Sequence, residues 1–162
     1  MTATTTAPQL IDAGSLDRLV EAARTSPRRR KNQNFHASNE DVCHRLLNAV
    51  EPGSYVVPHR HMDPNKDESF VVLRGRFGLV LFDTGGAVTH ALVLDHAGPN
   101  LGITIPHGTF HSLVALAPGS VFFEAKAGPF LPLSPEEVAP WAPAEQAPEA
   151  GAYFSKLRAL FP

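Results

Sequence analysis

Short apolar runs dominate the middle of the chain, from residue 54 to about residue 127. Each run is rich in Val, Leu, Ile or Phe, and Gly, Pro, Asn or Asp separates it from the next. Seven such runs follow one another without helical spacing between them: SYVVPHRH, ESFVVLRG, RFGLVLFD, AVTHALVLD, LGITIPHG, HSLVALAPG and SVFFEAKAG. This pattern predicts antiparallel strands that form a sandwich or a small barrel.

Two turns between these runs contain glycine. Gly85-Gly86 lies between the third and fourth runs, and Pro118-Gly119 lies between the sixth and seventh. Glycine adopts a positive φ at little cost, and tight hairpins need that conformation. We therefore expect turns at both places.

Helical spacing precedes the strand-rich segment. After a loose arm of about twelve residues, SLDRLVEAAR predicts a short helix capped by Ser15, with apolar positions at Leu16, Leu19, Val20 and Ala23. A second helix is predicted after Ser38, which forms a plausible capping box with Asp41. Its apolar stripe would contain Val42, Leu46, Leu47 and Val50, and Pro52-Gly53 would end it.

The segment after Gly128 is rich in Pro, Ala and Glu. Proline at this density excludes interior strands and long helices. We expect a strap over the outside of the barrel, anchored by Trp141 and ending in a short helix; a disordered tail is the alternative. The whole is one mainly β domain, with an arm and two helices over residues 1–50, a barrel over 51–128, and the strap and terminal helix over 129–162.

Composition narrows the class of protein. The chain has 162 residues and a formal net charge of -2, which argues against binding to nucleic acid through overall positive charge. A single cysteine, Cys43, cannot form an internal disulfide and is expected to be a small buried residue. We find neither a secretory signal nor a run long enough to cross a membrane, so a cytoplasmic location is expected.

Candidate chemistry begins with PHRHMDPNKDESFVVLRG, residues 58–75. Residues two apart on a strand point to the same face, so His59 and His61 can share one ion. Glu68 opens the next predicted strand, and a hairpin would bring its carboxylate alongside them. Imidazole with one carboxylate is typical of a first-row transition metal rather than of magnesium or calcium.

A fourth ligand is predicted from IPHGTFH, where Pro106 and Gly108 form a turn just before His111. That turn would direct His111 toward the others and complete a set of three histidines and one glutamate. For each histidine taken singly, an exposed polar residue at the end of a strand is the ordinary interpretation. The spacing of the group favours the metal site.

These motifs resemble those of the cupin superfamily. Gly53, His59-x-His61, Glu68 and Gly75 resemble the first cupin motif, and Pro106-x-Gly108-x-x-His111 resembles the second. Two departures are visible: six residues separate His61 from Glu68, where three or four are common, and Ala115 stands where asparagine is frequent. Because of the longer MDPNKD insert, Asp63 and Asp67 are alternatives to Glu68 as the ligand.

The wider match is similar to the WbuC-type cupin metalloproteins. It includes RRKNQNFH, HRLLNAVEPGSYVVPHRH, VLRGRFGLVLFD, GTFHSLVAL, VFFEAKAGPF and APWAPAE, over about residues 26 to 146. The resemblance implies a cupin barrel of six to eight strands with one bound divalent metal, Fe, Mn, Ni or Zn. It also implies a link to O-antigen and other surface-polysaccharide synthesis, and a homodimer, since cupins are commonly dimers and a barrel edge needs covering.

Additional groups are candidates for a reaction. Phe122, Glu124 and Lys126 share one face of a predicted strand, so Glu124 is a candidate general acid or base with Lys126 beside it, or the two simply form an ion pair. Arg30, Asn34 and His36 lie in the one basic segment, SPRRRKNQNFH, which is either a solvated loop or an arm over the barrel mouth that holds phosphate or carboxylate. His107 is a candidate proton shuttle or an exposed residue, and His44, His90 and His96 receive no role.

Three functions remain open at this point. The first is a metal-dependent isomerase, epimerase or oxygenase that acts on a small polar molecule, sugar-derived or anionic. The second is a sugar-binding or sensing module whose metal is structural, and the third is a structural protein with a vestigial site. A fold alone does not decide among them.

Overall fold

The computed structural model describes residues 7–162. Within them the chain forms helix α1, strands β1 to β8 and helix α2 in sequence order. The bounds are α1 Ala13–Thr25, β1 Arg30–Asn34, β2 Cys43–Val50, β3 Glu68–Arg74, β4 Arg76–Phe82, β5 Val88–Asp95, β6 Gly102–Ile105, β7 Phe110–Ala115, β8 Ser120–Ala127 and α2 Ala150–Arg158. Neither helix of this described part is long and apolar enough to cross a membrane.

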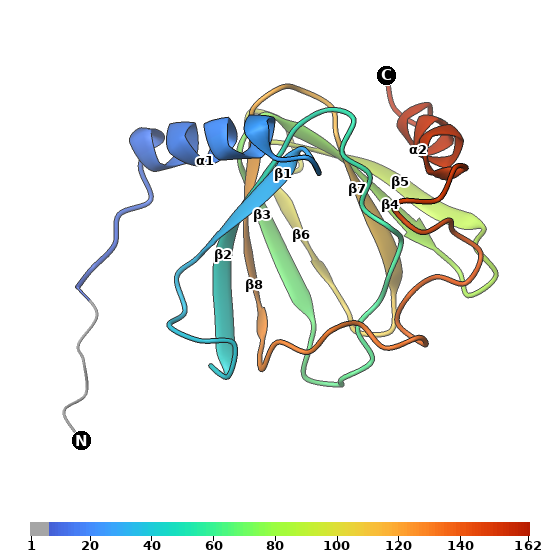
Figure 1. The fold of residues 1–162 in the computed structure, drawn as a ribbon, viewed down its shortest axis with the longest axis horizontal. Coiled ribbons are helices and arrows are strands. Elements are labelled where there is room, and N and C mark those ends of the chain that lie inside the picture. Colours follow the sequence, from blue (N-terminus) through green and yellow to red (C-terminus); the bar gives the residue numbers. More distant parts are fainter. Residues whose placement is uncertain (1–6) are drawn as a thin grey trace.

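The strands form two antiparallel sheets that face each other (Figure 1). One sheet has the order β1-β2-β8-β3-β6 and the other the order β5-β4-β7. Several neighbouring strands are far apart in the sequence: β8, for example, lies between β2 and β3, which is the crossed connectivity of a jelly roll. The predicted fold, a small mainly β jelly-roll barrel, is confirmed.

The space between the sheets holds the central core. Phe70 and Phe122 contribute from the larger sheet, and Phe77 and Leu79 from the smaller one. Strand residues alternate between two faces, so each of these strands sends every second side chain inward. Polar side chains replace the apolar ones toward one part of this interior, and that part contains the candidate site.

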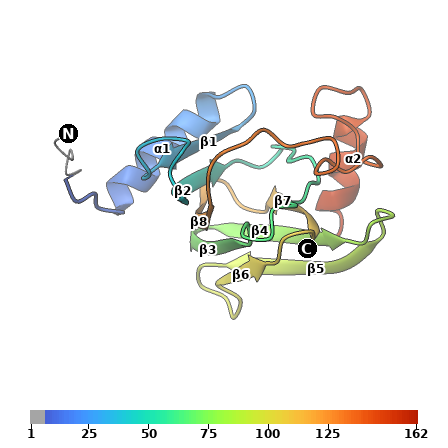
Figure 2. The same cartoon turned by 90° about the horizontal axis from the view of Figure 1, so that it is seen from below.

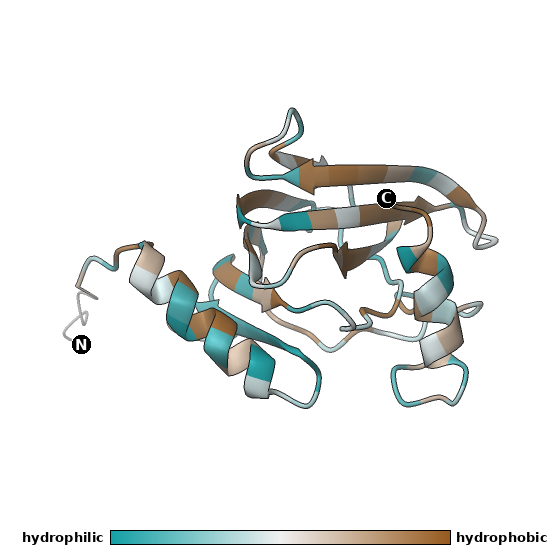
Figure 3. Cartoon of the chain, turned by 90° about the horizontal axis from the view of Figure 1, so that it is seen from above, coloured by the Kyte–Doolittle hydropathy of each residue, from teal (hydrophilic) through white to brown (hydrophobic). Residues whose placement is uncertain are grey.

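Helix α1 covers the outer face of the larger sheet (Figure 3). Leu19, Val20 and Ala23 pack there on Leu47 and Val121. The predicted helix is confirmed, but its N-cap is Asp12 rather than Ser15. Ser15 is the third residue of a capping box in which each side chain bonds the other's backbone N–H.

The outer face of the smaller sheet is covered by α2 and by the segment that leads to it (Figure 2). Val80 and Val114 of the sheet contact Phe161 and Leu157 in one buried cluster. Trp141 packs on Phe82 and Phe110, at ring distances of 4.8 and 5.8 Å. The predicted strap, its tryptophan anchor and its terminal helix are thus confirmed for residues 129–162.

The second predicted helix is wrong, because residues 43–50 form strand β2 and residues 30–34 form β1. Strand β2 lies inside the larger sheet, paired with β1 on one side and β8 on the other. Helix α1 covers one face of β2, and the other face lies toward the space between the sheets. Apolar residues therefore occur on both faces, and their spacing resembles that of a helix. The barrel therefore includes strands that precede residue 51.

Some smaller predictions also change. Residues 54–61 run extended without a regular ladder, although His59 exchanges backbone hydrogen bonds with His111. Cys43, predicted to be buried, is exposed, and His44, which received no role, is buried. The turns at Gly86 and Gly119 are confirmed, with φ of 90° and 68°.

Candidate metal centre and cavity

The four predicted metal ligands come together from three separate segments. His59 and His61 lie on the extended segment before β3, Glu68 is the first residue of β3, and His111 is the second residue of β7. The backbone bonds between His59 and His111 fix the first segment against β7. Residues that are 43 and more positions apart in the sequence therefore meet because of the barrel topology.

The cluster is compact and mostly buried. His61 Nε2 lies 2.6 Å from Glu68 Oε1, and His111 Nε2 lies 3.1 Å from Glu68 Oε2. The ligand atoms of His59, His61 and Glu68 all lie within 4.8 Å of one another. The ring of His111 lies 4.6 Å from that of His59, centroid to centroid. One small cation could contact His59, His61 and Glu68, and His111 lies beside this group.

Backbone carbonyls set the tautomer of two of the histidines. His59 Nδ1 donates to Val57 O and His111 Nδ1 donates to Thr109 O, each at 2.9 Å. With the proton on Nδ1, the neutral ring presents a lone pair at Nε2, and metal-ligating histidines usually show this arrangement. Burial, and then the neighbouring His111, lower the pKa of His59 to about 3, so this ring is neutral at physiological pH.

His111 Nε2 provides the test of whether a metal fits. It is buried and has no hydrogen-bond partner within residues 7–162. It faces a carboxylate oxygen of Glu68, and two acceptors at 3.1 Å repel each other unless a proton or a cation lies between them. The donor set of three imidazoles and one carboxylate suits a first-row divalent metal. The residues present fit such an ion.

Glu68 carries the negative charge of the cluster. Burial acts to raise its pKa, but contacts with His111 and His61 and the charge of Lys126 lower that pKa well below the usual range. Lys126 Nζ donates to Glu68 Oε1 at 2.8 Å. Glu68 is therefore ionised, and Lys126 connects it to the predicted catalytic pair.

Glu124 and Lys126 form that pair on β8, on the same face as Phe122. Lys126 Nζ lies 2.6 Å from Glu124 Oε1, and the Asn48 amide donates to Glu124 Oε2 at 2.7 Å. Burial raises the pKa of Glu124, and this effect outweighs the opposing influence of Lys126. Burial also acts on Lys126, yet the two carboxylates raise its pKa above the ordinary value. The Lys126 ammonium thus forms ion pairs with both Glu68 and Glu124.

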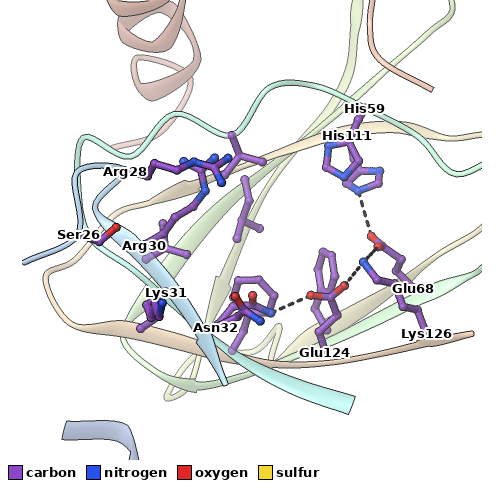
Figure 4. Close-up of a pocket in the computed structure, with 17 residues that line it drawn as sticks. Ser26, Arg28, Arg30, Lys31, Asn32, His59, Glu68, His111, Glu124 and Lys126 are labelled. Atoms are coloured by element: carbon purple, nitrogen blue, oxygen red, sulfur yellow. Dashed lines mark hydrogen bonds and ion pairs between the residues drawn. The ribbon is translucent and has the colours of Figure 1, made fainter. Parts of the chain in front are cut away.

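A cavity of about 370 Å³ opens beside this cluster (Figure 4). Figure 4 shows His59, His111, Glu68 and Lys126 at one end and Arg28 and Arg30 at the other. Aliphatic and aromatic side chains complete the walls, namely Ala49, Val50, Val56, Phe70, Leu113 and Phe122. The cavity size suits a small organic molecule, with polar groups at both ends.

Glu145 holds the two arginines at the far end. Its carboxylate accepts from Arg28 Nη2 at 2.7 Å and from Arg30 Nη1 at 2.9 Å. Arg30 Nη1 also donates to Ser54 Oγ and Tyr55 O. Lys31 lines the same end. Three cations thus face one carboxylate there, which leaves an excess of positive charge.

The predicted substrate-binding residues are only partly brought together. Arg30 lines the cavity, whereas Asn34 and His36 lie outside its lining. His36 stacks on His44 with ring centroids 4.0 Å apart. The sequence reasoning missed Asn48 and Glu145. Asn48 could be assigned to the site only if residues 43–50 were recognised as a strand. Glu145 lies in the strap, where the only sequence signal was the resemblance of APWAPAE.

The alternatives to Glu68 lie elsewhere. Asp63 accepts hydrogen bonds from Asn65 within the insert. Asp67 accepts from the backbone and the ring of His107 and is exposed. His107 is therefore engaged at the surface rather than in the cluster, and Glu68 is the carboxylate that the histidines contact.

The sequence matches one family model over residues 11–94, more than half of the chain, described as "Domain of unknown function (DUF6016)". The chain belongs to this family. The model covers His59, His61 and Glu68 but ends before His111. Among curated proteins, no sequence matches this chain significantly.

Solved structures with a similar fold include KdgF, an oxalate decarboxylase and an 11S globulin. KdgF from Halomonas sp. is 20% identical, with a TM-score of 0.49 over 64% of this chain and 83% of that one. A variant of oxalate decarboxylase from Bacillus subtilis is 16% identical, with a TM-score of 0.47 over 60% of this chain and 24% of that one. Procruciferin, an 11S globulin from Brassica napus, is 15% identical, with a TM-score of 0.44 over 54% and 21%. At these identities no substrate or reaction carries over to this chain.

Proposed function

We propose that this protein is a metal-dependent enzyme that acts on a small, polar, anionic molecule such as a sugar derivative or a nucleotide sugar. The reaction class is isomerisation, epimerisation or oxygenation. One observation carries the proposal: a buried set of imidazole and carboxylate acceptors lies at the end of a cavity whose opposite end is positively charged. A role in surface-polysaccharide synthesis rests on the sequence resemblance alone.

The metal would be held by His59, His61, Glu68 and His111. When bound, a divalent Fe, Mn, Ni or Zn ion supplies a Lewis acid for a carbonyl or hydroxyl group, or activates water or oxygen. The Nδ1 bonds of His59 and His111 to backbone carbonyls hold those rings in position. The protein thereby presents preformed ligands rather than recruiting mobile ones.

Glu124 is the proposed general acid or base. It is buried in the cavity wall, and burial raises its pKa, so it exchanges a proton more readily near neutral pH than an exposed glutamate does. Asn48 fixes one carboxylate oxygen and Lys126 the other. Lys126 holds the orientation of both Glu68 and Glu124, and its ammonium stabilises negative charge that develops between them.

The anionic part of the substrate is expected at the arginine end. Arg28, Arg30 and Lys31 line this end of the cavity and are the proposed anion-binding residues, whereas Asn34 and His36 do not line it. Glu145 occupies a bidentate face of each guanidinium and keeps both oriented, so the excess positive charge at this end, rather than a second bidentate pair, would attract the anion. A molecule bound there would extend its other end toward Glu124 and the metal ligands.

Elemental analysis of protein made without a histidine tag tests the metal centre. We expect close to one equivalent of Fe, Mn, Ni or Zn per chain, and at least a tenfold lower content in His59→Ala and His111→Ala. His90→Ala is the matched control, because His90 is an exposed residue of β5 far in sequence from the ligands. Metal retained in both ligand variants would contradict the assignment.

A second experiment separates an enzyme from a binding module. Metal-loaded protein is incubated in D₂O with hexose phosphates and nucleoside diphosphate sugars, and products and deuterium exchange are followed by ¹H NMR. We expect turnover of at least one compound and a loss of about 10²-fold or more in Glu124→Gln, with Glu136→Gln, an exposed residue, unchanged. Saturable binding without any product would favour the sugar-binding module instead.

A further inference from the structure

A second cavity, of about 290 Å³, adjoins the metal ligands on another side. His59 and Lys126 line both cavities, and His61 lines only this one. The other walls are His44, Lys66, the last residue of β8 and four residues at the start of the C-terminal strap, namely Ala127, Pro129, Phe130, Leu131 and Leu133. The ligand cluster thus separates two cavities of different character.

Lys66 is the unusual group in this second cavity. Only 8% of the residue is exposed, and its ammonium donates to the Pro129 carbonyl at 3.0 Å. Among the residues that the structure describes, no carboxylate forms an ion pair with it. Buried charges are normally paired, because burial removes the favourable hydration of the ion. An ammonium with unused N–H groups in a cavity wall is a suitable partner for an anion.

The strap supplies apolar surface next to this ammonium. Phe130, Leu131 and Leu133 line the cavity and yet remain exposed, Leu131 to 66%. The strap is held in place by backbone bonds from Gly128 N to Val42 O and from Phe130 N to Asn39 O. Large apolar side chains that are fixed but uncovered gain free energy when a ligand covers them.

We propose that the second cavity binds a carboxylate with an apolar tail, whose anionic group contacts Lys66 and whose tail lies on Phe130, Leu131 and Leu133. Neither feature suffices alone, because a sugar would leave the apolar wall unused and a hydrocarbon would leave the ammonium unpaired. Lys126 is already engaged by Glu68 and Glu124, so Lys66 carries the recognition. The site depends neither on the metal nor on the proposed reaction.

Calorimetric titration with hexanoate tests the site, with acetate and 1-hexanol as probes that lack the tail or the charge. We expect hexanoate to bind at least tenfold more tightly than either. Lys66→Gln should weaken hexanoate about tenfold and leave hexanol unchanged, while Lys66→Arg restores binding. Leu131→Asp should also weaken hexanoate at least tenfold; this exposed position can be changed without disturbing the core, so the test survives if Lys66→Gln fails to fold.

Matched measurements separate this site from the first cavity. Lys31→Gln, in the other cavity, should leave hexanoate binding unchanged, and so should removal of the metal with a chelator. Amide shifts at residues 130, 131 and 133 should follow the titration. The proposal is overturned if hexanoate shows no saturable binding, if Lys66→Gln and Leu131→Asp both bind it normally, or if binding is lost with the metal or in Lys31→Gln.

Discussion

At the scale of single residues, backbone carbonyls determine what the histidines can do. The Nδ1 atoms of His59 and His111 are committed to carbonyl oxygens, so their remaining nitrogens act as acceptors. His36 and His44 also contact backbone carbonyls, those of Arg45 and Asn39, but their rings stack on each other. The place of each ring in the fold, together with its backbone partner, therefore determines its chemistry.

Lys126 contacts two buried carboxylates, Glu68 and Glu124. We expect Lys126→Met to lower the free energy of unfolding of metal-free protein by about 3 kcal/mol, because two buried negative charges would lose their cation. With metal bound the loss should be smaller, since the ion neutralises Glu68. Urea denaturation after chelation measures this. Lys31→Met, an exposed lysine, should change stability by less than about 0.5 kcal/mol; equal losses would refute the pairing.

His44 predicts a dependence of stability on pH. Burial, and then the neighbouring His36, lower its pKa in the folded protein from the ordinary value of 6.5. Below about pH 6.5 the unfolded chain therefore binds more protons at this residue than the folded chain does, so stability falls as the pH falls. Urea midpoints measured between pH 7.5 and 5 should show this slope. His44→Gln should reduce it and the exposed His90→Gln should not; an unchanged slope in His44→Gln would assign it to other groups.

At the scale of elements, the positions of the apolar runs predict most strands of the barrel correctly. Six of them became β3 to β8, because alternation and glycine turns act over a few residues and can be read locally. The run at 54–61 did not become a regular strand. Strand β2 was mistaken for a helix because its pairing with β8, from residues 43–50 to 120–127, is a long-range event that leaves no local pattern.

Exposure along β2 gives a direct test of strand against helix. Val42 and Leu47 would both belong to the apolar stripe of the predicted helix, yet Val42 is 83% exposed and Leu47 fully buried against α1. Leu47→Ala should cost about 2–5 kcal/mol of unfolding free energy, and Val42→Ala less than about 0.5 kcal/mol. Chemical denaturation of the two variants decides the matter, and similar costs would support the helix.

The candidate site was predictable to a similar degree. His59, His61 and His111 followed from spacing and from the turn at Gly108, and the structure brings them to Glu68 despite the longer insert. Asn48, Glu145 and Lys66 could not be found, because packing between distant segments brings Asn48 and Lys66 to the cavity walls and Glu145 to the two arginines. Residue spacing within a short segment identifies the candidate histidine ligands, but it does not identify residues such as Asn48 and Lys66 that distant segments bring to the cavities.

At the scale of the whole molecule, three cores are stacked in one domain. Helix α1 packs outside the larger sheet, the central core lies between the sheets, and α2 with the strap packs outside the smaller sheet. The four proposed metal ligands come from both sheets and from the segment between β2 and β3. A bound ion would therefore connect parts of the chain that separate when the protein unfolds.

This connection predicts that metal removal lowers the stability of the entire domain. A ligand that binds only the folded state at a hundred times its Kd stabilises it by about 2.7 kcal/mol, and for a chain of this size that raises the melting temperature by about 5–10 °C. Calorimetry of tag-free protein with and without chelator should show such a difference in the wild type and in His90→Ala. It should be absent in His59→Ala, which melts near the chelated wild type whether or not metal is supplied. A shift that persists in His59→Ala would place the stabilising ion elsewhere, and equal melting temperatures in the wild type would show that the ligands bind no ion tightly enough to hold the two sheets together.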